Sequence, residues 1–189
     1  MTAVSETSLL NEGVRSYPKA LGAVNEFIRL LSSTIRDAVI EELEDLSAAM
    51  GNLFKEDEIE DYVRPKTLRN LDKDICLGVK IDRRPESGWG LFFLLYWLKG
   101  EPNLSVSIWL KDTEIAASIL TAFKKVPTKE TVGIWGAGHE VYVSRAIAPD
   151  DEEQIPVTVR ELTESFSHLW KNAGGLEKFL KLSGKGTAK

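Results

Sequence analysis

The stretch from Leu91 to Lys99 constrains the fold of this chain more than any other. It reads LFFLLYWLK and is apolar on both of its alternating faces. Successive side chains of a β-strand point to opposite faces, so both faces of this strand must be buried. Such a strand belongs in the interior of a sheet, with other parts of the protein packed against each face.

The two segments beside this stretch read as its neighbouring strands. Residues 75–81 and 104–111 each alternate between two kinds of side chain, as strands with unlike faces do. In the second segment, the apolar face holds Leu104, Val106, Ile108 and Leu110, and the opposite face holds Ser105, Ser107, Trp109 and Lys111. We therefore expect a meander of three antiparallel strands from Ile75 to Leu110.

A long helix is predicted before this meander, from about Pro18 to Met50. Its apolar residues recur every 3.6 positions on average, which is typical of a straight helix lying on a globular body; they are Leu21, Val24, Ile28, Leu31, Ile35, Val39, Leu43, Leu46 and Met50. At ~1.5 Å per residue the helix would be about 50 Å long. A compact domain of this size is roughly 40 Å across.

The length of this helix leaves two alternatives. It bends, with Ser32–Ser33–Thr34 as the weakest helix-forming segment, or one end overhangs the body. An overhanging amphipathic end needs a partner, and a second copy of the chain is the simplest one. Charged substitutions at Leu43 and Leu46 are then expected to separate a dimer.

The remaining elements follow from local signals. Residues 53–74 read as a connection with a short acidic helix at most. A helix over 113–126 is capped by Asp112 or Thr113 and ended by Pro127. Residues 131–135 and 140–148 form a strand pair around Gly136–His139. Thr158-x-x-Glu161 resembles a capping box that opens a final helix, which Gly174–Gly175 ends and a last turn over 176–182 follows.

This order of elements predicts the α+β class. We expect a mainly antiparallel five-stranded sheet with a long N-terminal helix and further helices packed on it. Residues 1–15 are expected to be a flexible N-terminus, 16–182 a single domain and 183–189 a flexible tail. No apolar run is long enough to span a membrane, the first residues lack the pattern of a secretory signal, and the chain has one cysteine. We therefore expect a cytoplasmic protein.

The sequence contains no familiar chemical motif. Two histidines and one cysteine do not suffice for a Cys/His zinc site. Phosphate-binding and dinucleotide-binding glycine patterns are missing, and so is a G-x-S-x-G nucleophile motif. We therefore assign no catalytic residue, no metal site and no cofactor.

Charge is unevenly distributed along the chain. Residues 1–62 hold 5 Lys/Arg against 13 Asp/Glu, whereas residues 63–111 hold 9 against 5. The two segments could be complementary surfaces that meet within the chain or across a dimer. The simpler interpretation, which we favour, is that the acidic positions are solvated helix faces.

One candidate site follows from connectivity. If the helix over 113–126 is a crossover, strand 131–135 runs parallel to strand 104–111. Loops 82–90 and 136–139 then lie at the same end of the sheet and gather Arg83, Arg84, Trp89 and His139. Arginine, an aromatic ring and histidine suit an anionic ligand or a partner protein. The alternative is that these are ordinary solvated turn residues.

The polar face of the sheet is a second candidate surface. Trp109 shares it with Ser105 and Ser107, and Trp135 and Tyr142 can join it. Large aromatic residues among small polar ones are typical of a binding or dimer face. They also suit a core beneath the long helix, and we favour that interpretation because the central strand needs a cover on this side.

These observations lead to one functional hypothesis and two alternatives. The first is a non-enzymatic interaction or regulatory module of a cytoplasmic, bacterial-type protein, which binds a protein partner or a second copy of itself and no membrane. The second is an enzyme or sensor for a small anionic ligand at the 82–90/136–139 end. The third is a nucleic-acid accessory protein that uses the cations between 64 and 84, which the net charge of −5 disfavours.

Overall fold

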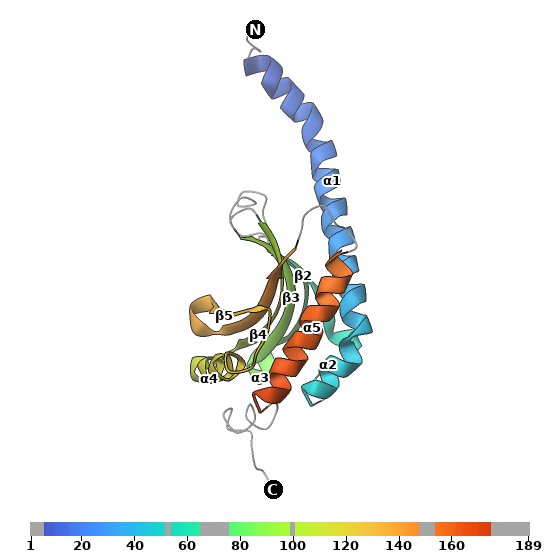
Figure 1. Cartoon of the computed structure of the whole chain (residues 1–189). Helices are drawn as coiled ribbons and strands as arrows, with labels where there is room; N and C mark the ends of the chain where they lie inside the picture. The colour runs from blue at the N-terminus through green and yellow to red at the C-terminus, as the bar shows by residue number, and fades with distance from the viewer. Residues whose placement is uncertain (1–5, 52–53, 65–75, 99–100, 148–153, 175–189) are drawn as a thin grey trace.

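In the computed structural model, a six-stranded antiparallel sheet carries helices packed on one face (Figure 1). The described residues are 6–51, 54–64, 76–98, 101–147 and 154–174. The strands are β1 (Ile59–Arg64), β2 (Cys76–Arg83), β3 (Trp89–Leu98), β4 (Glu101–Leu110), β5 (Thr131–Trp135) and β6 (Glu140–Ala146). The helices are α1 (Glu6–Glu41), α2 (Leu43–Ala49), α3 (Arg84–Ser87), α4 (Thr113–Phe123) and α5 (Gln154–Asn172), with short 3-10 turns η1 (Glu56–Glu58) and η3 (Gly136–Gly138).

The predicted α+β class is confirmed, but the sheet has one strand more than the five we expected. The additional strand is β1, at the edge of the order β1-β2-β3-β4-β6-β5. Its sequence, IEDYVR, lies in the segment that we interpreted as a connection because it is rich in charge. An edge strand pairs on one side only and tolerates charged side chains, so its apolar pattern is weak.

The central strand lies where the sequence predicts it. β3 pairs with β2 on one side and β4 on the other, and Phe93 lies opposite Val79 and Val106. Leu91, Phe93 and Leu95 point to one face, Phe92 and Leu94 to the other, and all five are buried. Burial of both faces is what an uninterrupted apolar strand requires.

The main core lies between the sheet and the helices. Val79, Phe93 and Val106 belong to one apolar cluster with Ile35 of α1 and Phe166 of α5. Helix α4 joins the same cluster, and Phe123 of α4 contacts Phe166 edge-on with ring centroids 5.7 Å apart. Phe92 and Leu94 are buried but lie outside this cluster, because they point to the other face of the sheet.

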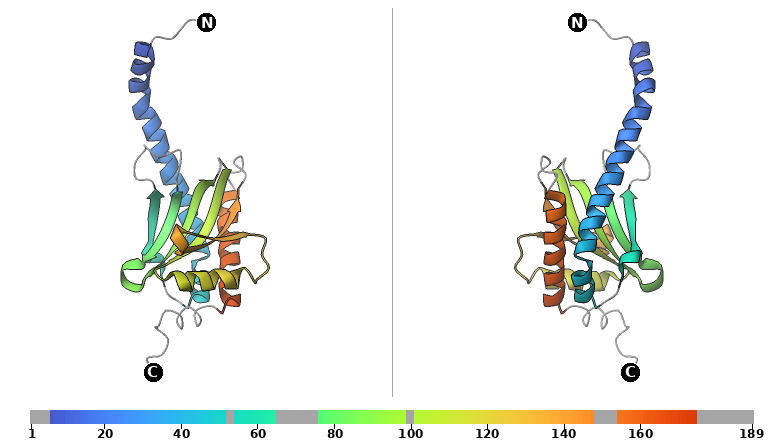
Figure 2. Two further views of the ribbon diagram at one scale, coloured as in Figure 1. Left: turned by 90° about the vertical axis from the view of Figure 1, so that its left-hand side faces the viewer. Right: turned by 90° about the vertical axis from the view of Figure 1, so that its right-hand side faces the viewer.

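The N-terminal helix differs from the predicted one at both ends. It begins at Glu6 and passes through Pro18, where we expected its start, and it breaks at Glu42 before the separate α2. The segment Ser32–Thr34, which we considered a possible bend, is regular helix. Part of the helix does overhang, but it is the N-terminal part, which projects beyond the sheet in all three views (Figures 1 and 2). Leu43 is only 7% exposed and Leu46 is fully buried, so charges there would disrupt the core rather than separate a dimer.

The later helices confirm one cap and correct another. Asp112 caps α4 by accepting hydrogen bonds from the backbone N–H groups of Glu114 and Ile115. Thr158 opens no helix, because α5 begins at Gln154 and Thr158 is a buried residue inside it. Proline is tolerated in the first turn of a helix, so Pro156 allows the earlier start. The predicted last turn over 176–182 lies outside the described residues.

The connection through α4 fixes which loops are neighbours. β6 pairs antiparallel with both β4 and β5, so β5 runs in the same direction as β4. The C-terminal ends of β4 and β5 therefore lie at the same end of the sheet as the connection between β2 and β3. Lys111 donates its backbone N–H to Gly88 O, and Leu110 donates its own to His139 O, both at 2.8 Å.

Candidate functional site

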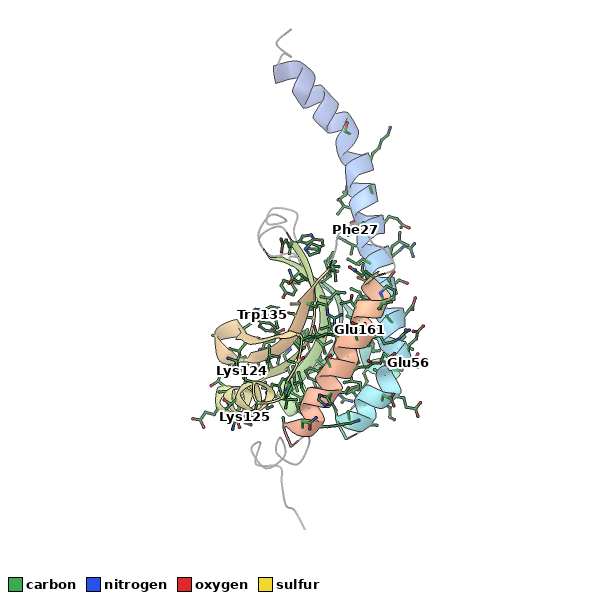
Figure 3. All side chains as sticks on the ribbon, viewed as in Figure 1. Phe27, Glu56, Lys124, Lys125, Trp135 and Glu161 are labelled. Atoms are coloured by element: carbon green, nitrogen blue, oxygen red, sulfur yellow. The ribbon has the colours of Figure 1, made fainter. Side chains whose placement is uncertain are left out.

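The sheet has a face that none of α1, α2 and α5 covers, here called the open face. It carries Phe92, Leu94, Ser105, Ser107, Trp109, Trp135, Glu140, Tyr142 and Ser144. In Figure 2 (left) these three helices lie behind the strands, and Figure 3 shows Trp135 on the side of the sheet away from α5. We expected the Trp109 face to lie beneath the N-terminal helix. This expectation is wrong, because α1 packs on the opposite face, against Val79 and its neighbours.

Arg84 extends over this face at the end of the sheet. Its guanidinium carbon lies 5.4 Å from the centre of the Phe92 ring and 5.7 Å from that of Trp109. Its Nε atom donates to Asp82 Oδ1 at 2.8 Å, and its Nη2 atom to Oδ2 at 2.5 Å. These bonds lower the pKa of Asp82 well below its ordinary value, although partial burial acts in the other direction. A bidentate ion pair thus holds the guanidinium over two aromatic rings.

His139 also packs against Trp109. The two rings stack with centroids 5.3 Å apart and planes inclined by 18°. The Nδ1 atom of His139 lies 2.9 Å from Leu110 O, which fixes the ring against the end of β4. The loop before it is strained: Ala137 has a φ of 56° between two glycines that also have positive φ. Arg84 and His139 thus both contact the Trp109 ring.

A second aromatic group lies further along the same face. Trp135 stacks on Tyr142 with ring centroids 3.9 Å apart, and Tyr96 contacts Trp135 edge-on at 4.9 Å. Burial raises the pKa of Tyr96, and its hydrogen bond with Ser144 opposes that rise. Tyr142 approaches so closely because residue 133 is glycine: a Cβ there would lie 2.3 Å from the tyrosine oxygen.

Small polar residues lie between the two aromatic groups. Ser107 is completely buried, and its hydroxyl donates to Glu140 Oε1 at 2.5 Å. Ser105, 2% exposed, lies with its hydroxyl 3.4 Å from Leu94 O. These bonds join neighbouring elements: Ser107 of β4 to Glu140 of β6, and Ser105 of β4 to Leu94 of β3.

The structure brings together two of the four site residues that the sequence predicts. Arg84 and His139 meet at Trp109. Arg83 is the last residue of β2 and precedes Arg84. Its side chain points to the other face of the sheet and forms an ion pair with Glu58. Trp89 is buried in the main core, with its ring 6.4 Å from that of Phe54. The alternation of side chains along β2 and β3 could have shown that Arg83 and Trp89 point to the core face, away from Arg84 and His139. That required extending the predicted strands to include Arg83 and Trp89.

Charge at this end of the sheet is balanced. Lys80 binds Glu60 at 3.0 Å and Asp82 at 3.1 Å, and Arg84 also binds Asp82. At the C-terminal end of α1, Arg160 of α5 binds Glu41 at 2.7 Å and Glu42 at 2.9 Å. The acidic N-terminal part of the sequence therefore meets cations within the same chain, and an incoming anion would have to compete with Asp82 for Arg84.

The projecting part of α1 is the second surface of interest. Phe27 and Leu30 are each 50% exposed there, and Leu21, Val24 and Ile28 are only partly buried. Figure 3 places Phe27 on α1 where the helix leaves the body of the protein. Phe27 and Leu30 were not predicted from the sequence, because they lie outside the apolar stripe that faces the core.

Comparison with protein-family models, with curated proteins and with solved structures found no match for this chain. None of the described helices combines the length and apolar character that crossing a membrane requires. Among the described residues, no group of three or more His, Cys, Asp or Glu side chains is arranged to hold a metal ion.

Proposed function

We propose that this chain is a non-enzymatic interaction module that binds another protein chain through the projecting part of α1. The observation that carries the proposal is the exposure of Phe27 and Leu30, each 50%, on a helix that extends beyond its own body. Half-exposed large apolar side chains on an extended helix are suited to covering by a partner. The single cysteine favours the cytoplasm, where thiols stay reduced.

Affinity capture from the source cells tests this proposal. The tagged full chain is compared with a Phe27→Ser/Leu30→Ser variant, and bound proteins are identified by mass spectrometry. We expect the variant to lose a partner that the unaltered chain retains, with the same melting temperature, because both side chains already contact solvent. Val157→Ser is the matched control, since Val157 is 48% exposed on α5, away from the projection. Identical captures from all three baits would contradict the proposal.

The anionic-ligand alternative keeps one supporting observation, the contacts of Arg84 and His139 with the Trp109 ring. A cation and an imidazole against one indole could hold a small planar anion. Calorimetric titration with inorganic phosphate, benzoate and a nucleoside monophosphate tests it, with Arg84→Gln as the comparison. Saturable heat that disappears in Arg84→Gln would favour this function. For the nucleic-acid alternative, the cations between 65 and 75 lie outside the described residues. Of the described ones, Lys80, Arg83 and Arg84 all bind carboxylates, which lowers their support for it.

A further inference from the structure

We infer that the partner of the projecting part of α1 is a second copy of this chain, and that the two copies pair as a coiled coil over residues 10–24, before Ile28 and Leu31 pack in the chain's own core. This inference rests on the proposed function and identifies the partner. It follows from the spacing of apolar residues, from the placement of charge and from the low intrinsic stability of the projecting helix.

The apolar spacing in the projecting part is that of a coiled coil. Leu21, Val24, Ile28 and Leu31 follow each other at steps of three, four and three residues. The same alternation continues toward the N-terminus in the sequence, through Tyr17, Val14 and Leu10. These steps average 3.5 residues over three heptads, which is the spacing of positions a and d in a coiled coil. Ile28 and Leu31 pack in the chain's own core, so the seam for a second copy is the part of this stripe up to Val24.

The period changes where the helix reaches the body. From Leu31 through Ile35 and Val39 to Leu43 every step is four residues. The average spacing of 3.6 residues between apolar positions therefore combines a segment of period 3.5 before Leu31 with a segment of period 4 after it. A period of 3.5 keeps a stripe facing one partner helix, so the change marks the point where the contact within the chain begins.

Charge supports pairing between identical helices. Five charged residues occur between 10 and 31, and all of them fall at heptad positions b and f, away from the seam: Glu12, Arg15, Lys19, Glu26 and Arg29. Two of these, Glu26 and Arg29, bond to each other at 2.7 Å on the solvent side of the helix. The positions that flank the seam are uncharged, and one of them is Phe27, whereas Leu30 falls at position c, outside the seam. Two copies therefore meet without like-charge repulsion.

The projecting helix also needs support that its own body does not give. Its sequence includes Gly13, Pro18 and Gly22. In a helix interior, glycine and proline are the two least favourable residues. Gly22 has no atom within 4 Å of where its Cβ would be, so packing does not explain the glycine. Most of the stability of a helix in a protein comes from packing of its amphipathic face, and a paired seam supplies such packing.

Sedimentation equilibrium on the full chain tests the inference. We expect the unaltered chain to be a dimer at micromolar concentration. Leu21→Glu/Val24→Glu places charges at positions a and d and is expected to raise the dimer dissociation constant at least a hundredfold, with an unchanged circular dichroism signal from the sheet. The matched control Gly22→Glu/Ala23→Glu places the same charges on the exposed side, and it is expected to remain a dimer.

A charge-swap experiment identifies the partner as a second copy. The Leu21→Glu/Val24→Glu variant is mixed with Leu21→Lys/Val24→Lys, and we expect a mixed dimer to form where neither variant pairs alone. A monomeric unaltered chain at 100 µM, roughly the upper end of a specific weak association, would overturn the coiled coil and leave the capture experiment to decide the proposed function. A dimer that survives both glutamates would also overturn it. The proposed function can also fail on its own. That is the outcome if the Phe27→Ser/Leu30→Ser bait captures the same proteins as the unaltered chain while the unaltered chain still forms dimers.

Discussion

Arg145 of β6 binds the buried carboxylate of Glu130, with the arginine Nε 3.0 Å from the glutamate Oε2. The Glu130 side chain is completely inaccessible, whereas that of Arg145 is 27% exposed. Arg145 also binds Glu161 of α5, so one guanidinium connects the start of β5, the strand β6 and the last helix. Hydrogen bonds with both glutamates, chiefly Glu130, raise the pKa of Arg145 and keep it charged.

The first prediction concerns this ion pair. Arg145→Ala leaves the Glu130 carboxylate buried without its main counter-charge, and we expect a loss of about 3–5 kcal/mol in the free energy of unfolding. Urea denaturation measures it. Arg160→Ala is the control, because that arginine also binds two glutamates but is 46% exposed, and its removal should leave the midpoint nearly unchanged. Equal effects of the two substitutions would show that burial of Glu130 is not the cause.

The second prediction concerns the central strand. Phe93 is 1% exposed and lies between β2 and β4 in the main core, so Phe93→Ala should lower the free energy of unfolding by about 3–5 kcal/mol. Guanidinium denaturation gives the value. Phe27→Ala removes the same side chain from a half-exposed position and should cost far less. A loss below about 1 kcal/mol for Phe93→Ala would mean that β3 is not the centre of the core.

The third prediction concerns the close approach of Tyr142 to β5. In Gly133→Ala the new methyl group would lie 2.3–2.7 Å from three atoms of the Tyr142 side chain. The ring must therefore move off Trp135, and we expect a loss of roughly 1–3 kcal/mol from overpacking. The near-ultraviolet circular dichroism spectrum should change at the same time, because the stacked pair is separated. Gly22→Ala, in open space, should leave that spectrum unaltered; an unaltered spectrum in Gly133→Ala would contradict the stack.

The fourth prediction concerns pH. The pKa of Asp82 is lowered in the folded protein by its bonds with Arg84, so its contribution to stability is present above the ordinary aspartate pKa of about 3.9. That contribution is lost as the pH falls below 3.9 toward the folded-state pKa. We therefore expect Asp82→Asn to be less stable than the unaltered chain at pH 7, with the difference narrowing below pH ~4. Arg84→Gln should show the same narrowing, and a difference that stays constant with pH would exclude this linkage.

Several features of the fold could be predicted because local patterns were sufficient. The apolar run from Leu91 fixed an interior strand, and Asp112 was placed correctly as a cap because the side-chain bond that it makes is local. The crossover rule also placed Arg84 and His139 at the same end of the sheet, where both contact Trp109. The rule describes chain direction, however, and it does not say to which face a side chain points.

Other features could not be predicted, since their cause lies in contacts between distant segments. β1 carries charges that an edge position tolerates, so its sequence resembles a loop. α5 starts before Thr158 because the first turn accepts Pro156, and no local signal outweighs the capping-box pattern there. The change of period in α1 at Leu31 was visible in the sequence, but averaging over the whole helix concealed it.

The sequence by itself determined that a strand apolar on both faces lies at the centre of an antiparallel sheet, that helices pack on it, and that the N-terminal helix is too long for the body. Only the tertiary structure decided which face α1 covers. Both faces of β3 are apolar, so burial alone favours neither side for the helix. The choice depends on the neighbouring strands: α1 packs on the face where β2 and β4 are apolar, which leaves Trp109 and Ser107 on the face without it.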